Sequence, residues 1–322
     1  MESEPASPLP TLPAPSALEA ARLKRETQIG YVFAAVGAVL FSTKAIFVKL
    51  AYAEAVDAET LLALRMGLSL PFYLFIGYLA VADRQKRGVA LPSYRYLLRA
   101  SIIGLIGYWV ASYTDFIGLQ YISAQFERLI LFTYPLFVVI MGALLFGYRV
   151  HSRVILSVIV SYLGLALIFG ENFKLEGENV TLGSAFVLGS AISFALYQLL
   201  AKNAIAETGP RMFTCIAMIA ASLGAFVQFG LTHNLSALAV SPPVLGYGFL
   251  IAVFSTVLPS FFMSAALHRI SAAANGAIGT LSPLVTIILA AIVLGEELSV
   301  IAILGTILVL AGVGWFTLTS QK

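Results

Sequence analysis

The chain has 322 residues, of which 60% are hydrophobic and 11% are charged, and its mean hydropathy is +0.94. About a quarter of the residues of a soluble globular protein are charged, so this composition excludes that class and predicts an integral membrane protein. The net charge of +3 points to no particular partner, and the single cysteine, Cys215, excludes an intramolecular disulfide and a cysteine metal cluster.

The first 28 residues differ from the rest of the chain. They are rich in proline, alanine and serine at first and become polar in the stretch EAARLKRETQ. They lack a charged segment followed directly by a short apolar core, which is the pattern of a cleaved signal peptide. We therefore expect residues 1–28 to form a flexible cytoplasmic tail.

Ten apolar runs follow this tail. A helix of about 20 residues crosses about 30 Å of hydrocarbon at 1.5 Å per residue, and each run approaches or exceeds that length. The sequence therefore predicts an all-α integral membrane protein with ten transmembrane helices. The runs cover residues 30–50, 60–81, 97–119, 122–146, 153–170, 181–202, 211–231, 244–268, 272–294 and 299–318.

The distribution of lysine and arginine predicts the orientation, because these residues favour the cytoplasmic side. With the N-terminus inside, the ten runs leave Lys174 as the one cation outside, among several acids. Both termini are therefore predicted to be cytoplasmic. The cations on the predicted cytoplasmic side are Arg22, Lys24, Arg25, Arg84, Lys86, Arg87, Arg95, Arg99, Arg149, Arg153, Lys202, Arg211, Arg269 and Lys322.

One stretch of the chain occurs twice. Residues 121–147 align without a gap on residues 269–295, at an offset of 148 residues. Self-similarity at a fixed offset indicates that a structural unit was duplicated. The shared features are the Ile-Ser-Ala openings (122–124 and 270–272), the Pro-Leu pairs (Pro135 and Pro283) and the closing glycines (Gly147 and Gly295).

The duplication divides the chain into two five-helix units, 29–170 and 181–318. Because five is odd, the second unit enters the membrane from the opposite side. Such inverted repeats build the two access states of secondary transporters around a site near the midplane. The chain has no GxxxxGK[ST] motif, so nothing indicates that it is driven by ATP.

The two repeat segments, YISAQFERLILFTYPLFVVIMGALLFG and RISAAANGAIGTLSPLVTIILAAIVLG followed by Glu296, resemble EamA-type, ten-helix members of the drug/metabolite transporter superfamily. The resemblance covers residues 30–318, and it departs where Tyr148 replaces the usual glutamate after Gly147. It implies a secondary transporter of small organic solutes. The first expectation is a YddG-like exporter of aromatic or other neutral amino acids that works by alternating access. A carrier of drugs or other metabolites with the same fold is the alternative.

Six ionisable residues lie inside the predicted spans of the first half, all in the outer half of the membrane. A charge in hydrocarbon costs at least about 2.5–3.5 kcal/mol, so these residues should face protein or water. The second half places Tyr197, Met263, Asn275 and Gly276 at the positions that correspond to Lys44, Asp115, Glu127 and Arg128. The six residues are Lys44, Lys49, Arg65, Asp115, Glu127 and Arg128.

Two interpretations of these charges stay open. In the first, Lys44, Arg65 or Arg128 attracts a substrate carboxylate, while Glu127 or Asp115 takes an amine or a proton. In the second, the charges form structural ion pairs, such as Arg65 with Asp115 or Lys44 with Glu127. Structure is the favoured role of Arg65, Arg128 and Asp115. Adjacent helical residues point about 100° apart, so Glu127 and Arg128 are not expected to serve one partner.

Aromatic residues form a second candidate set. Tyr108, Trp109 and Tyr113 lie at mid-depth, and Trp109 and Tyr113, four residues apart, share a helix face. Such a face suits an apolar or aromatic solute, and core packing is the alternative role. Further candidates of the same kind are Tyr134, Tyr197 and Phe261.

Prolines inside the spans predict helix kinks, since each removes a backbone hydrogen bond. These residues are Pro71, Pro135, Pro259 and Pro283. The sequence has no HExxH motif and no metal-ligand cluster, so we expect no metal, no cofactor and no catalytic residue, and a membrane-embedded enzyme is disfavoured. The expected partners are a small-molecule substrate, most readily an amino acid, and the lipid of a bacterial inner membrane.

Overall fold

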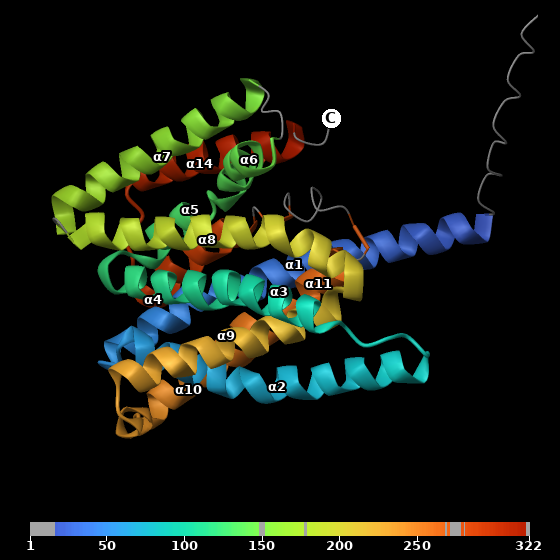
Figure 1. Ribbon diagram of the computed structural model, residues 1–322. Coiled ribbons are helices and arrows are strands. Elements are labelled where there is room, and N and C mark those ends of the chain that lie inside the picture. Colours follow the sequence, from blue (N-terminus) through green and yellow to red (C-terminus); the bar gives the residue numbers. More distant parts are fainter. Residues whose placement is uncertain are drawn as a thin grey trace, which may run out of the picture.

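The computed structural model describes residues 17–147, 152–176, 179–267, 269–270, 278–279 and 281–319, and these parts of the chain contain helices and no strands. The helices lie side by side in one bundle (Figure 1). In the first half they are α1 (Ala17–Ala53), α2 (Ala58–Lys86), α3 (Tyr94–Gly104), η1 (Leu105–Val110), α4 (Ala111–Tyr121), α5 (Ala124–Leu131), α6 (Tyr134–Phe146) and α7 (Ser152–Glu176). In the second half they are α8 (Asn179–Thr208), α9 (Pro210–Thr232), η2 (Leu235–Leu238), α10 (Pro242–Ala252), η3 (Val253–Val257), α11 (Leu258–Leu267), α13 (Leu281–Leu289), η4 (Ala290–Leu294) and α14 (Val300–Thr319).

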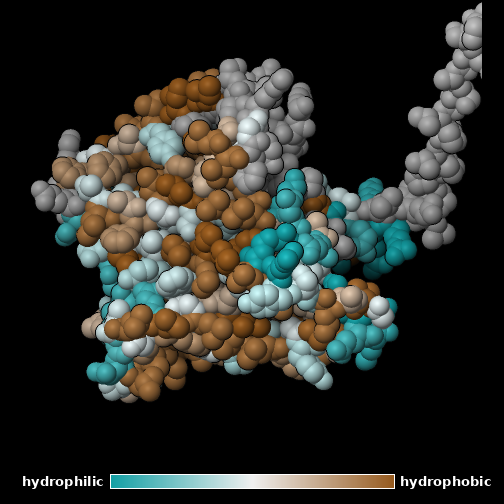
Figure 2. All heavy atoms as spheres, in the orientation of Figure 1, coloured by the Kyte–Doolittle hydropathy of each residue, from teal (hydrophilic) through white to brown (hydrophobic). Residues whose placement is uncertain are grey.

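Length and composition make this bundle suited to a bilayer. Within the described residues, 8 helices are long and apolar enough to cross a membrane, and Leu281–Leu294 and Val300–Trp315 form two shorter apolar helices. Apolar residues cover most of the visible middle of the bundle, while hydrophilic residues gather toward its margins (Figure 2). An apolar flank is expected where lipid rather than water surrounds a protein.

Helix α1 corrects one expectation from the sequence. It begins at Ala17, inside the stretch predicted to be a flexible tail, and continues without interruption to Ala53. Alanine, leucine, glutamate, arginine and lysine, which fill this stretch, are all strong helix formers. The side chain of Glu26 also accepts a hydrogen bond from Arg269 Nε at 2.9 Å, which ties this polar extension to the second half.

The two halves of the chain interleave rather than pack as separate blocks. Helix α1 packs on α11 and α13, α4 on α8, α2 on α9, and α7 on α14. Irregularities recur at the repeat offset as well: the π-helical turns η1 and η3 begin at Leu105 and Val253. Gly147 and Gly295 have the same left-handed conformation, with φ 68° and ψ 22°. Matching local geometry of this kind is what a duplicated unit predicts.

Helices α7 and α14 approach each other through small residues. A Cβ atom added to Gly164 would stand 2.5 Å from the carbonyl oxygen of Gly305, and one added to Gly312 would stand 2.8 Å from that of Ser157. Gly312 would also overlap the side chain of Ser161. Glycine at such positions lets two membrane helices come into backbone contact.

The N-terminus of α5 joins the two halves at the end of the bundle that carries residues 54–57. Ser123 Oγ accepts from the amide of Phe126 at 3.2 Å, which makes it the N-cap. The carboxylate of Glu296 accepts from the amides of Ala124 and Gln125, at 2.7 and 3.1 Å. Together these groups satisfy amides that a helix start leaves without partners. The Ile-Ser-Ala motif of the first half and the glutamate after Gly295 thus meet in space.

The prolines lie at different kinds of helix interruption. Pro135 is in the first turn of α6, after Phe132 and Thr133 separate it from α5. Pro259 follows the π-helical turn η3, and Pro283 lies in the first turn of α13. Helix α2 is assigned without a break across Pro71.

The contact between α7 and α14 predicts that replacing glycine by alanine changes stability differently at Gly312 and Gly314. Gly312→Ala should destabilise the protein, because its methyl group overlaps Ser161, whereas Gly314 has nothing within 4 Å of an added Cβ. Gly314→Ala should be neutral or stabilising by up to about 1 kcal/mol, the difference in helix propensity. Thermal unfolding of the purified protein in detergent measures both, and equal shifts would contradict this packing.

The cap on α5 predicts a loss of stability in Glu296→Gln. An amide has one acceptor oxygen in place of two, so one of the two hydrogen bonds to α5 is lost. Hydrogen bonds to a charged group contribute about 1.5–3 kcal/mol. The neighbouring Glu297 is exposed, so Glu297→Gln is the matched control and should leave the unfolding midpoint unchanged.

Candidate functional site

Lys44 lies between two carboxylates in the interior of the bundle. It projects from α1, and its ammonium group forms an ion pair and hydrogen bond with Asp115 Oδ2 of α4. Its Nζ is also 3.4 Å from Oε1 of Glu127, in the first turn of α5. All three residues are buried, and Glu127 is 0% exposed. Three helices thus bring opposite charges together where neither water nor lipid reaches them.

Two arginines complete this group of charges. Arg128 Nε is 3.7 Å from Oε2 of Glu127, and its Nη2 donates to the carbonyl oxygen of Phe41 at 3.4 Å. Arg65 of α2 donates from Nε to Thr256 Oγ1 at 2.8 Å, and its guanidinium lies 5.4 Å from the centre of the Phe116 ring. Arg65 also interacts electrostatically with Asp115. We call Lys44, Arg65, Asp115, Glu127 and Arg128 the charge cluster.

The charge cluster agrees with the sequence analysis in part. The predicted ion pair of Lys44 with Glu127 is present, but Asp115 pairs with Lys44 rather than with Arg65. Glu127 and Arg128 belong to one cluster, but beyond their contact with each other they face different groups, in line with their 100° separation: Glu127 lies beside Lys44, whereas Arg128 donates to the carbonyl oxygen of Phe41. Every residue of α5 is buried, so protein surrounds this helix on all sides. The counterparts of Glu127 and Arg128 at 275 and 276 lie outside the described residues.

An aromatic group continues from the charge cluster into the middle of the bundle. Thr256, which accepts from Arg65 Nε, also accepts at its carbonyl oxygen from the hydroxyl of Tyr73 at 3.4 Å. The hydroxyls of Tyr108 and Tyr197 are 3.0 Å apart, and their rings meet edge to face. The ring of Phe194 stacks on that of Tyr197 and meets the ring of Tyr134 edge to face. We call Tyr73, Tyr108, Tyr134, Phe194, Tyr197 and Phe261 the aromatic group; Tyr134 contacts Phe194 and Phe261 contacts Tyr73.

Trp109 and Tyr113 are neighbours on one helix, but their polar atoms bind residues outside the charge cluster and the aromatic group. The indole N–H of Trp109 donates to Gln228 of α9 at 2.6 Å, and the hydroxyl of Tyr113 donates to Glu59 of α2 at 3.0 Å. The indole ring also packs at Gly224. These contacts support a packing role for Trp109, which was one of its two predicted roles.

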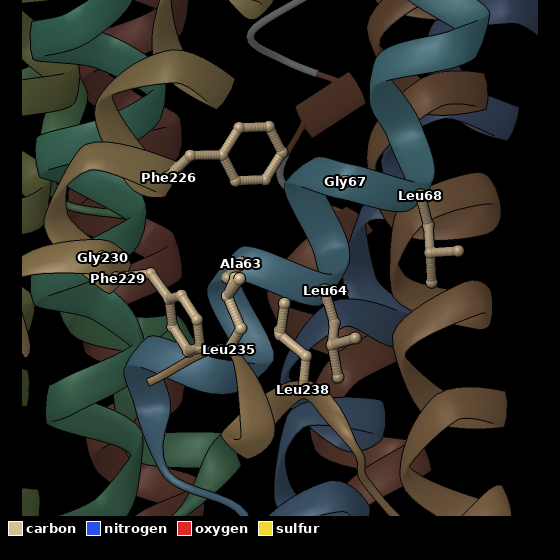
Figure 3. Close-up of a pocket in the computed structure, with 9 residues that line it drawn as sticks. All are labelled: Ala63, Leu64, Gly67, Leu68, Phe226, Phe229, Gly230, Leu235 and Leu238. Atoms are coloured by element: carbon tan, nitrogen blue, oxygen red, sulfur yellow. The ribbon is translucent and has the colours of Figure 1, made fainter. Parts of the chain in front are cut away.

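An apolar cavity of about 310 Å³ lies apart from the charge cluster. It is bounded by α2, α9 and η2, and none of its lining residues is ionisable (Figure 3). Such a lining offers no partner to a charged solute. The lining residues are Ala63, Leu64, Gly67, Leu68, Phe226, Phe229, Gly230, Leu235 and Leu238.

Sequence reasoning missed three participants, Tyr73, Thr256 and Glu296. Thr256 and Glu296 come from the second half, whereas the six ionisable residues inside the predicted spans are in the first. Glu296 follows the closing glycine of the repeat and its partner Ala124 belongs to the Ile-Ser-Ala motif, but neither pattern indicates that the two meet. Tyr73 and Thr256 are common residues in apolar runs, and only the packing of α2 against η3 selects them.

Comparison with known proteins decides the family. The sequence profile of the EamA-like transporter family matches residues 28–170 and again residues 181–318. The chain belongs to the EamA-like transporter family. This EamA-type protein is a multi-pass integral membrane transporter of the bacterial inner membrane.

Individual relatives agree with this family. The EamA-type chain is 30% identical over 298 residues to the uncharacterized transporter YcbK of Bacillus subtilis, which covers 87% of this chain and 90% of the relative. It is 30% identical over 165 residues to the threonine/homoserine exporter RhtA of Salmonella typhimurium, covering 51% of this chain and 55% of the relative. A solved crystal structure covers 92% of this chain and 98% of its own, with a TM-score of 0.60 and 16% identity, which shows a common fold.

The position of Lys44 between two carboxylates predicts a strong effect of its removal. Lys44→Met should destabilise the transporter by about 3–5 kcal/mol, because two buried carboxylates lose their shared cation. Adding Asp115→Asn should restore more than about 1 kcal/mol of this loss, since it removes one of the uncompensated charges. Thermal unfolding in detergent is the measurement. The control is Arg87→Met, which breaks an exposed pair with Asp83 and should have little effect.

Proposed function

We propose that this EamA-type transporter exports neutral amino acids, and that the charge cluster together with the aromatic group forms the substrate site. The observation that carries this proposal is an unfilled hydrogen-bond donor on the buried Arg65. Its guanidinium is buried and held at one side by Thr256, yet its Nη1 has no hydrogen-bond partner among the described residues. A buried donor without a partner is costly, so it is expected where a ligand supplies the acceptor. A carboxylate is the best match for a guanidinium.

The signs of the neighbouring charges fit a zwitterion. Three cations and two carboxylates in the charge cluster leave one positive charge in excess, which favours a substrate carboxylate at Arg65. Glu127 and Asp115 offer acceptors for its ammonium group. The same excess disfavours a cationic drug. The aromatic group begins beside Arg65 and would receive the side chain of the amino acid.

The name of one relative supports the same substrate class. RhtA is a threonine/homoserine exporter and matches about half of this chain. We extend its class of substrate, and its direction of transport, to this protein as part of the proposal.

Alternating access would proceed by movement between two inverted repeats, 29–170 and 181–318. The recurrence of η1 as η3 and the matching glycine caps support two equivalent units. The arrangement has ten spans, with both termini in the cytoplasm, which the sorting of lysine and arginine favours. In this orientation the 54–57 end, where Glu296 caps α5, faces the outside.

Counterflow in liposomes tests the substrate class. The purified protein, loaded with unlabelled amino acid, should take up labelled threonine, methionine or phenylalanine in a saturable way. Arg65→Gln should raise the half-saturating concentration about tenfold, because a charged hydrogen bond to the substrate carboxylate contributes about 1.5–3 kcal/mol. Arg87→Gln, an exposed arginine, is the matched control and should behave as the parent. Absence of exchange for all three amino acids would overturn the amino-acid assignment.

A further inference from the structure

Glu127 is a buried carboxyl group whose two oxygens are both available. Oε1 is 3.4 Å from Lys44 Nζ and Oε2 is 3.7 Å from Arg128 Nε, distances of ion pairs. Neither oxygen has a hydrogen-bond partner among the described residues. Lys44 gives its hydrogen bond to Asp115, and Arg128 donates to the carbonyl oxygen of Phe41. An ionised carboxylate is costly to bury in this condition, because its acceptors stay unfilled.

Asp115 supplies the acceptor that a proton on Glu127 would need. Its Oδ2 is bound by Lys44, while its Oδ1 has no partner in the described part of the chain. The two carboxyl groups contact the same ammonium group and interact with each other. Two carboxylates that share one site repel each other, which favours uptake of a proton by one of them.

The charged groups on the helices around α5 indicate that Glu127 is the carboxyl group that exchanges a proton. The cluster faces it with Lys44 from α1, Asp115 from α4 and Arg128 from α5 itself, while Arg65 from α2 faces Asp115. At the start of α5, Glu296 is occupied by two amides, and Glu171 of α7 accepts from Ser299. Helix α8 carries Tyr197, which belongs to the aromatic group, and Lys202 and Glu207 toward its far end, while residues 281–289 of α13 include no ionisable residue.

We propose that Glu127 is the proton-binding site of a proton/amino-acid antiport, an inference that rests on the transport function proposed above. A proton and the ammonium group of the substrate compete for the same carboxylate oxygens. When Glu127 is ionised, it accepts from the substrate. When a proton from the outside binds to Glu127, the protonated carboxyl group donates a hydrogen bond to Asp115, the positive excess of the cluster grows, and the ammonium group is expelled. The proton leaves toward the cytoplasm when the next substrate binds, so one proton moves inward for each amino acid that moves outward.

The test uses the full chain in proteoliposomes with labelled threonine, or whichever of the three amino acids exchanges best. The interior is made one pH unit more acidic than the exterior, and potassium with valinomycin holds the membrane potential at zero. One-to-one antiport should accumulate the amino acid about tenfold inside, the concentration ratio that one pH unit represents. An internal pH dye should report a rise in pH when the substrate is added.

Variants locate the proton site. In Glu127→Gln, the ratio of uptake with the gradient to uptake without it should fall to one, whatever transport rate remains. Glu127→Asp keeps a carboxyl group and should keep a ratio above one. Glu171→Gln is the matched control, a partly buried glutamate at the same end of the bundle, and should keep the parental ratio.

The outcomes separate this inference from the proposed function. Counterflow by the parent protein without any response to the pH gradient would overturn the antiport and leave the amino-acid carrier standing. A full gradient response in Glu127→Gln would also overturn it, since another group would then carry the proton. If the parent shows no counterflow for any tested amino acid, both proposals fall. The parental measurement decides the question even if Glu127→Gln does not fold.

Discussion

The ammonium group of Lys44 holds together the charge cluster of the proposed substrate site. Among the described residues it is the one cation that forms ion pairs with both Asp115 and Glu127, which come from α4 and α5 while Lys44 comes from α1. Other polar contacts also fix α1, such as the hydrogen bond from Tyr52 to the carbonyl oxygen of Phe116 in α4. A buried ion pair is a weak source of stability but a strong constraint on arrangement. The cluster therefore orients α1, α4 and α5 toward a common point, and the aromatic group extends from that point.

In the fold, the two repeat motifs supply the groups that cap the N-terminus of α5. The Ile-Ser-Ala motif supplies the N-cap of α5 through Ser123, and the glutamate after Gly295 supplies the second acceptor. Each motif is local in sequence, yet the contact between them joins the two halves. At the opposite end, the contact of Arg99 with Glu207 involves two half-exposed side chains, which water weakens.

Much of the fold could be predicted from the sequence, because span length and repeat offset are one-dimensional properties. The positions of the helices and the grouping of Lys44, Asp115, Glu127 and Arg128 follow from them. The pairing within the cluster does not, since it depends on how each helix is rotated about its axis. Helices with apolar residues all around give no periodic signal for that rotation. Thr256 shows the same limit: it has the composition of any span residue, and only α2 packing against η3 makes it the anchor of Arg65.

The interruption at Phe132 and Thr133 has a mechanical consequence. It ends α5 after 8 residues and separates this helix from the longer α6. The N-terminus of α5 contacts Glu296, and the same short helix carries Glu127 and Arg128 of the charge cluster. In the alternating access proposed above, a tilt of α5 that broke its contact with Glu296 would also change the distances from Glu127 and Arg128 to Lys44. Opening of that end and rearrangement of the charges would then be one displacement of one helix.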